Sequence, residues 1–228
     1  MDAPIKRTIF ELIKSNDDNL IFKLIIFAKI TSPEAVLDLF TNTIKKYPPD
    51  VITGLLLMNS KYILCLIESM ENIIYEFSLS LLNNDRSKNL EVSRHFPIHF
   101  GDTGRFFSQW YSKEISWSKL SAGNSADDFE NFKKIYKNAI ENIYKFYWEL
   151  KSADVLEEQL EFLSREGSVH LPSIDTMELL ISNSWGCDLK KLVDNYYGNL
   201  EPEEDEVWPV QKIQTPSFDD FHNRSNKL

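Results

Sequence analysis

Residues Ile21–Ala28 (IFKLIIFA) form an almost uninterrupted apolar run of strand length. Such a run suits a central strand that is covered on both faces, because a half-exposed strand alternates apolar and polar residues. A chain with this segment is expected to build a sheet around it. The fold class therefore depends on which other segments supply the neighbouring strands and their cover.

A helix and a hairpin follow this first run. Ser32 and Pro33 are typical of a helix start, with serine as the N-cap and proline at the first helical position. The runs Val51–Met58 and Tyr62–Ile67 have strand length and composition, and the polar pair Asn59–Ser60 joins them. We predict that these two runs form a β-hairpin.

The next segments complete a known order of elements. Apolar residues recur at helical spacing over Glu71–Leu82, and Leu90–Phe96 and Gln109–Ile115 have strand character. The order β-α-β-β-α-β is typical of the ferredoxin-like arrangement. We predict an α+β fold in which a ferredoxin-like antiparallel sheet of four or five strands carries two helices on one face. We expect this unit to bury its own sheet face.

Beyond the polar linker Ser121–Ser125 the pattern becomes helical. Ser125 with Asp128 resembles a capping box. From Phe129 to Leu150 apolar residues return at helical spacing. Shorter helices are predicted over Val155–Leu163, Met177–Ile181 and Leu189–Tyr196.

These patterns divide the chain into four parts. We predict an N-terminal segment (1–19), a ferredoxin-fold domain (20–118), a helical extension (119–200) and an acidic, partly extended tail (201–228).

Charge limits the classes of partner. Residues 1–120 carry 14 basic and 14 acidic residues, whereas residues 121–228 carry 11 and 21, so the net charge of −10 comes from the second half. Nucleic-acid binding is not expected, because phosphate contacts need a basic face. No run of about 18 apolar residues is present, so no membrane span is expected. With two cysteines, the chain suits the reducing cytoplasm better than a disulfide framework.

Three motifs recur together in a known family. They are VITGLLL at Val51–Leu57, LCLIES at Leu64–Ser69 and RFFSQW at Arg105–Trp110. Together they resemble flavin-binding blue-light-sensor (BLUF) domains, whose pattern runs G-I-T-G-L-L-L, F-x-Q-x-L-E-G and R-x-F-x-x-W. The resemblance covers roughly the first half of the chain and implies a BLUF-like, ferredoxin-like domain.

The residues that handle flavin in that family are replaced here. Ile26 stands at the position of the photoactive tyrosine, Cys65 at that of the flavin-contacting glutamine, and Tyr47 at that of an asparagine before the second strand. Isoleucine has no ionisable proton, and a thiol is only a weak donor in place of an amide. We therefore expect no cofactor. The alternative is a flavin-binding light or redox sensor.

A second resemblance covers nearly the whole chain. SRHFP…RFFSQWY at Ser93–Tyr111 and the acid-rich DEVWP at Asp205–Pro209 are similar to the testis-expressed BLUF-like proteins. This resemblance implies a non-enzymatic structural or adaptor component of a ciliary or flagellar axoneme. Its partners would be other axonemal proteins in a large complex, with no nucleic acid, membrane or small-molecule substrate.

Aromatic residues in the second half are candidates for partner binding. The alternative for those in the long helix is packing of that helix onto the sheet, and the alternative for the tryptophan of the acidic tail is that it folds back onto the domain. The candidates are Phe129, Phe132, Tyr136, Tyr147, Trp148 and Trp208.

No pattern indicates a catalytic or metal site. Cys65 lies inside an apolar strand, where a lone thiol is typically a small core residue. His95 and His99 are four residues apart, but Pro97 interrupts any helix that could bring them onto one face. The sequence lacks GxSxG, P-loop and HExxH motifs. We therefore expect no enzyme activity.

Overall fold

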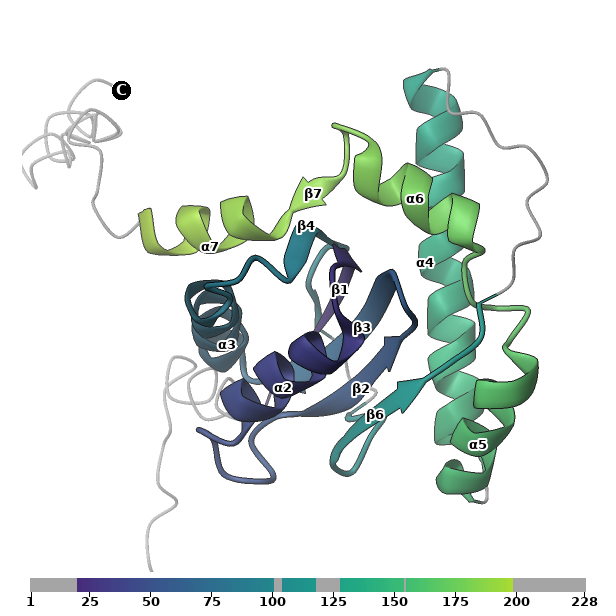
Figure 1. The fold of residues 1–228 in the computed structure, drawn as a ribbon, viewed down its shortest axis with the longest axis horizontal. Coiled ribbons are helices and arrows are strands. Elements are labelled where there is room, and N and C mark those ends of the chain that lie inside the picture. Colours follow the sequence, from purple (N-terminus) through teal and green to yellow (C-terminus); the bar gives the residue numbers. More distant parts are fainter. Residues whose placement is uncertain (1–19, 101–103, 118–127, 154, 199–228) are drawn as a thin grey trace, which may run out of the picture. The chain divides into compact units, whose positions relative to one another are not determined.

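The computed structural model describes residues 20–100, 104–117, 128–153 and 155–198 (Figure 1). The predicted segments 1–19 and 201–228 lie outside this range, as does Trp208. The chain divides into two compact units, Met1–Asn195 and Tyr196–Leu228. The described sheet and nearly all described helices belong to the first unit.

The helices match the predicted ones to within a few residues. They are α2 (Pro33–Ile44), α3 (Glu71–Asn84), α4 (Phe129–Lys151), α5 (Leu156–Glu166), α6 (Ile174–Ser182) and α7 (Leu189–Gly198).

The strands build one sheet with the order β6-β2-β3-β1-β4-β7, and β5 pairs separately with β1. They are β1 (Phe22–Ile30), β2 (Thr53–Met58), β3 (Tyr62–Ser69), β4 (Leu90–His95), β5 (His99–Phe100), β6 (Trp110–Glu114) and β7 (Cys187–Asp188). The predicted hairpin is present as β2 and β3. The predicted α+β class is confirmed, with two short additional strands, β5 and β7.

One edge of the sheet departs from the antiparallel prediction. Strand β6 pairs with β2 in parallel, because the chain returns to that edge by a long connection instead of a hairpin. Gly54, in β2, has a φ of +144°, and a Cβ there would lie 2.0 Å from the carbonyl oxygen of Leu66. Only glycine allows the strands to approach so closely at this point.

The central strands have two buried faces with different linings. Alternate residues of β1, β2 and β3 point to opposite sides. One side, here called the aliphatic face, is lined by Leu24, Ile26, Ala28, Leu56, Met58, Ile63, Cys65 and Ile67. The other, the aromatic face, is named for the rings that cover it, and its strand residues include Ile25, Phe27, Leu55, Leu57, Tyr62, Leu64 and Leu66.

Helices α2 and α3 cover the aliphatic face, as the ferredoxin-like order predicts (Figure 1). The predicted start of α2 is confirmed, since the side chain of Ser32 accepts a hydrogen bond from the amide of Ala35 and Pro33 opens the helix. Phe40 of α2 and Phe77 of α3 are fully buried, and their ring centroids lie 6.1 Å apart. The two helices therefore meet over this face.

The aromatic face is covered by helices from the second half of the chain. This finding corrects the expectation that the ferredoxin-like unit buries its sheet without them. Helices α4, α5 and α6 cover it and share one hydrophobic cluster with the strands (Figure 1). The physical reason is the uninterrupted apolar run: a strand without polar alternation needs cover on both sides. The helical extension therefore completes the core of the sheet.

The long helix α4 begins three residues later than the capping pattern suggested. Asp128 is the N-cap, and its carboxylate accepts a hydrogen bond of 2.7 Å from the amide of Asn131. Ser125 lies outside the described residues. The first glutamate of the helix, Glu130, favours this start through the helix dipole.

Candidate functional site

The flavin-related positions of the first half lie in the aliphatic core. Ile26 and Cys65 are directly paired across β1 and β3, and Leu56 of β2 is the next residue in the same row. All three side chains are completely buried. This row offers aliphatic contacts and one thiol, with no amide or phenol to hold a polar ring.

Two further observations concern the chemistry of this row. Burial raises the pKa of the Cys65 thiol well above its ordinary value, so the thiolate that would act as a nucleophile is suppressed. Tyr47 is partly buried and packs against the aliphatic cluster after the end of α2. Burial also raises the pKa of Tyr47.

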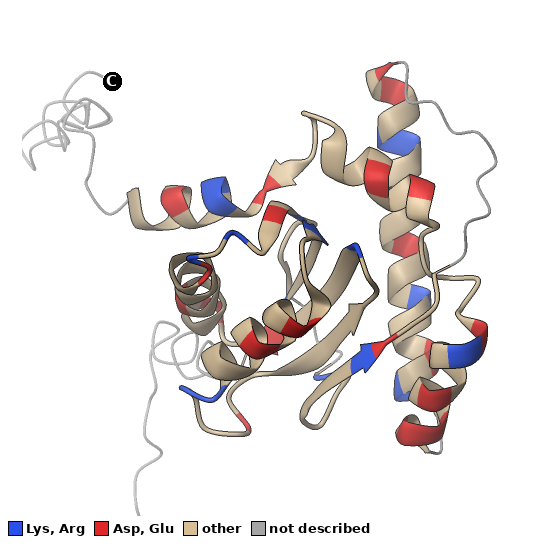
Figure 2. Ribbon diagram, in the orientation of Figure 1, with Lys and Arg blue, Asp and Glu red and all other residues tan. Residues whose placement is uncertain are grey.

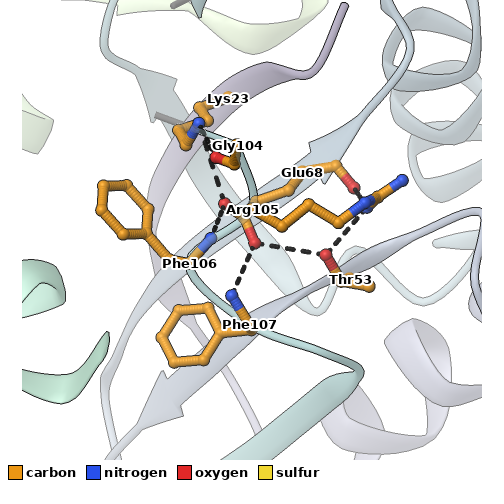
Figure 3. A network of polar contacts seen from close by, with 7 residues as sticks. All are labelled: Lys23, Thr53, Glu68, Gly104, Arg105, Phe106 and Phe107. Atoms are coloured by element: carbon orange, nitrogen blue, oxygen red, sulfur yellow. Dashed lines mark hydrogen bonds and ion pairs between the residues drawn. The ribbon is translucent and has the colours of Figure 1, made fainter. Parts of the chain in front are cut away.

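A polar network lies on the aromatic face at one end of the strands (Figure 3). The register places Lys23 of β1, Glu68 of β3 and Thr53 of β2 in one row. Lys23 and Glu68 are completely buried, with the Lys23 Nζ and a Glu68 carboxylate oxygen 4.0 Å apart. Thr53 donates its hydroxyl hydrogen to the Glu68 carboxylate over 3.2 Å.

The Glu68 carboxylate also holds the segment that leads into β6. It accepts hydrogen bonds from the amides of Phe106 (2.7 Å) and Phe107 (3.1 Å). The Lys23 ammonium donates to the carbonyl oxygen of Gly104 over 2.6 Å. These contacts tie residues 104–107 to two central strands, although more than thirty residues separate them along the chain from Glu68.

Arg105 extends the same network to the start of β2. Its guanidinium donates to the Thr53 hydroxyl (2.8 Å), the Glu68 carbonyl (2.7 Å) and the Val51 carbonyl (3.1 Å). The Ser69 hydroxyl donates to the same Val51 carbonyl over 2.6 Å. The arginine of the RFFSQW motif therefore links the segment before β6 to the start of β2 and the end of β3.

Burial lowers the pKa of Lys23, and the nearby Glu68 carboxylate opposes this change. Burial similarly lowers the pKa of Arg105. A buried charge is stable only when it is paired and hydrogen-bonded. Lys23 and Glu68 bind backbone groups of residues 104–107, so the network positions the loop before β6.

The predicted partner-binding aromatics of α4 fall into two groups. Phe132 (3% exposed) and Tyr147 (0%) belong to the core, so they offer no surface to a partner in this conformation. Tyr136 is partly buried, and its ring lies 4.8 Å from that of Phe96. Phe129 and Trp148 are exposed. The alternative of packing onto the sheet therefore applies to the buried pair.

Trp148 lies beside the polar network. Its ring meets that of Phe106 edge-on, with centroids 5.3 Å apart. The Lys151 ammonium lies 5.2 Å from the Trp148 centroid and 5.4 Å from that of Phe106. A cation over two aromatic rings stabilises this exposed arrangement.

Exposed aromatics were also missed from the sequence, among them Phe162 and Trp185. Trp185, between α6 and β7, is 44% exposed and lies 5.3 Å from the ring of Phe129, which is 51% exposed. Buried Phe132 contacts the tryptophan of this pair, with its ring 5.6 Å from that of Trp185. The signal was present, since a tryptophan flanked by Asn, Ser and Gly suggests a loop position.

The histidines and cysteines do not assemble a metal centre in the described part of the chain. His95 is buried, and its Nδ1 lies 2.8 Å from the Phe96 carbonyl oxygen. The ring of His99 packs 5.5 Å from that of Tyr144. Cys187 is exposed and reduced.

The fold and these sites define a class: an α+β protein whose sheet is buried on both faces and whose charged interior groups brace the fold. Within that class, the chain belongs to the testis-expressed protein 47 family, whose model matches residues 24–198. Membership indicates a testis-related role. No curated protein matches the chain significantly.

BLUF proteins are among the solved structures to which the chain is similar. The BLUF domain of BlrP1 shares 18% identity over 41% of this chain and 64% of its own, with a TM-score of 0.34. BlrP1 of Klebsiella pneumoniae, in a calcium and cyclic-diGMP complex, shares 14% identity over 54% of this chain and 35% of its own, with a TM-score of 0.33. A bacterial light-regulated adenylyl cyclase shares 16% identity over 63% of this chain and 39% of its own, with a TM-score of 0.35. The chain thus spans less than two thirds of each, and at these scores the likeness says nothing of activity.

None of the helices in the described ranges combines the length and apolar character needed to cross a bilayer.

Proposed function

We propose that this protein is a non-enzymatic adaptor within a ciliary or flagellar axonemal assembly, and that it acts by binding other axonemal proteins. The proposal places it in the cytoplasm, at the axoneme. Membership of a testis-expressed family supports a role in sperm cells. Within those cells, we propose the flagellum as the location.

The exposed aromatic pair of Phe129 and Trp185 carries this proposal. The two rings meet edge-on from separate elements and both remain about half exposed. Tryptophan and other aromatics dominate the binding energy of protein interfaces, especially where a buried base holds them in place. Phe132 supplies that base.

The interior supports an adaptor over an enzyme or a light sensor. Ile26 and Cys65 bring no strong hydrogen-bonding group to the aliphatic core. On the opposite face, the charges of Lys23, Glu68 and Arg105 bind one another and the backbone. The thiol of Cys65 and the charges of the polar network therefore contribute to the stability of the fold.

Removal of the aromatic pair tests the proposal. We expect the tagged full-length Phe129→Ala/Trp185→Ala variant to stay folded and to lose at least about fivefold of its incorporation into the axonemes of ciliated cells. Proximity labelling would identify the partners that are lost. Val169→Ala, which trims a side chain that is 92% exposed on another loop, serves as the control. Normal incorporation of the folded double variant would contradict the proposed surface.

A spectroscopic experiment separates the adaptor from the flavin-binding sensor. We expect the full chain, expressed with excess flavin and then purified, to show no flavin absorbance, because Ile26 and Cys65 provide no phenol or amide. A stoichiometric flavin spectrum in folded protein would establish the sensor instead.

A further inference from the structure

A cavity of about 1000 Å³ opens where α6 meets the end of the sheet. Its lining comes from the end of β1, the start of β4, the turn between β2 and β3, and the first turns of α6. Helix α6 contacts both β1 and β4, so these walls belong to the same compact unit. The cavity is separate from the Phe129–Trp185 pair and from the polar network.

Some charged residues of the cavity wall form an ion pair, and others do not. Lys29 and Glu91 form an ion pair at 2.8 Å on the strand side. On the helix side, Asp175 and Glu178 lie one turn apart in α6, where Figure 2 shows acidic residues. Neither carboxylate has an ion pair or a side-chain hydrogen bond among the described residues. Lys61, in the turn, adds one positive charge to the lining.

A tyrosine also lines this space. Tyr62 lines the cavity, yet the residue is only 4% exposed because its ring belongs to the aromatic-face cluster. Its hydroxyl has no hydrogen-bond partner in the part of the chain that the structure describes. Burial raises the pKa of Tyr62; the charges of Glu178 and Asp175 add to this effect, and that of Lys29 opposes it.

The turn that holds Tyr62 is braced by hydrogen bonds. The side-chain oxygen of Asn59 accepts hydrogen bonds from the amides of Lys61 and Tyr62, both 2.8 Å long. The carbonyl of Lys61 accepts from the amide of Ile30 over 2.8 Å. The backbone that carries Tyr62 is therefore fixed before any ligand arrives, which lowers the ordering cost of binding.

We propose that this cavity binds an arginine-bearing segment of a partner protein, with the guanidinium held by Asp175, Glu178 and the Tyr62 hydroxyl. Two carboxylates and a phenol oxygen are all acceptors, and guanidinium presents five N–H donors in a planar fork. A cavity of about 1000 Å³ exceeds one side chain and leaves room for neighbouring residues of the segment. A metal ion suits the wall less well, since no group of three metal ligands gathers in the described residues.

The binding test uses the full chain and a defined probe. The probe is the peptide acetyl-Gly-Gly-Arg-Gly-Gly-amide, and amide chemical shifts of the protein report its binding. We expect shifts at Lys61, Tyr62 and Glu178. We also expect binding at least about tenfold weaker for the citrulline peptide, which keeps the shape and loses the charge.

Matched variants test the site. Asp175→Asn/Glu178→Gln should weaken binding of the arginine peptide at least about tenfold, and Tyr62→Phe about two- to fivefold. The control Glu157→Gln/Glu158→Gln makes the same change in net charge in the first turn of α5 and should leave binding unchanged. Thermal unfolding of each variant confirms that it is folded.

Each other outcome overturns the proposal. Absence of binding by the arginine peptide, or an equal loss in both double variants, excludes a specific site. Methylguanidinium that binds as tightly as the peptide would identify a small-cation site instead of a protein-binding one. Because this site is separate from Phe129 and Trp185, its failure leaves the adaptor test unaffected.

Discussion

The two faces of the central sheet are buried by different chemistry. The aliphatic face is lined by branched and linear aliphatic side chains and closes under α2 and α3. The aromatic face meets Phe106, Phe107, Phe146 and Tyr147 and holds the network of Lys23, Glu68 and Arg105 at one end. Side chains on the aliphatic face act mainly through volume, whereas the aromatic face also fixes segments by directed hydrogen bonds.

This difference bears on how the fold is specified. A face filled by volume tolerates aliphatic exchange, since cores accept substitutions that conserve size. A buried network does not tolerate loss of one member, because the remaining charge stays buried without its partner. We therefore expect changes on the aromatic face to span a wider range of effects, from loss of folding to a gain in stability.

The largest effect should come from removing the cover of the aromatic face. Truncation after Ser121 removes α4, α5 and α6 and leaves one side of β1, β2 and β3 exposed. We expect this fragment to aggregate or to lack a cooperative transition in circular dichroism and size-exclusion chromatography. A chain ending at Gly198 is the control and should remain folded. A monomeric, cooperatively folded 1–121 fragment would show that the sheet stands without its second cover.

The next largest effect should come from the polar network. Glu68→Ala leaves Lys23 buried and removes the acceptor of the Phe106 and Phe107 amides. We expect a loss of about 3–5 kcal/mol in the free energy of unfolding, measured by urea denaturation. Glu91→Ala breaks an exposed ion pair and should cost at most about 1 kcal/mol. Similar losses in the two variants would remove the distinction between buried and exposed charge here.

A matched pair of leucines tests whether both faces are sealed equally. Leu56 points to the aliphatic face and Leu66 to the aromatic face, and both are completely buried. We expect Leu56→Ala and Leu66→Ala each to cost about 2–5 kcal/mol in urea denaturation. A cost below about 1 kcal/mol for Leu66→Ala alone would mean that the aromatic face is open to water in solution.

The sequence predicted the elements better than their cover. Period, capping and turn signals located the helices and the longer strands to within a few residues, because Ser32, Pro33 and Asn59–Ser60 act locally. The apolar run at Ile21–Ala28 even indicated cover on both faces. Which helices provide the second cover depends on contacts across more than a hundred residues, and no local pattern encodes those contacts.

The candidate sites show the same division. The positions of Ile26 and Cys65 could be predicted from the motifs, because alternation within a strand fixes the face of the sheet to which each side chain points. Burial of Phe132 and Tyr147 was not readable, since both lie in an amphipathic helix whose aromatic residues suit packing onto the sheet and partner binding alike. The Lys23–Glu68 pairing depends on strand register, which the sequence does not give directly.

A smaller effect, of opposite sign, should come from the aromatic face. The Tyr147 hydroxyl is completely buried and has no hydrogen-bond partner in the described structure. Tyr147→Phe keeps the ring contacts with Phe106 and Phe107 and removes this unsatisfied group. We expect a gain of about 1 kcal/mol in the free energy of unfolding. Tyr136→Phe, which loses a hydroxyl that donates to the His95 carbonyl, is the control and should bring no gain.

The smallest effect concerns pH and returns to the aliphatic face. His95 pairs with Ile26 across β1 and β4, so its side chain lies on that face. Burial lowers the pKa of His95 below its ordinary value of 6.5, and the hydrogen bond to the Phe96 carbonyl opposes this only in part. The folded chain therefore keeps His95 neutral at pH values where the unfolded chain already binds a proton.

The sign of the pH effect follows from this difference. As the pH falls through 6.5, protonation favours the unfolded chain, so stability is lost until the lower pKa of the folded state is reached. His95→Asn retains a donor for the Phe96 carbonyl and cannot titrate in this range. Urea denaturation from about pH 7.5 to about pH 5.5 should thus show a steeper loss of stability for the natural chain than for this variant. Parallel pH profiles would mean that His95 reaches water in the folded state, and that the aliphatic face is less tightly closed at β4 than at β1 and β3.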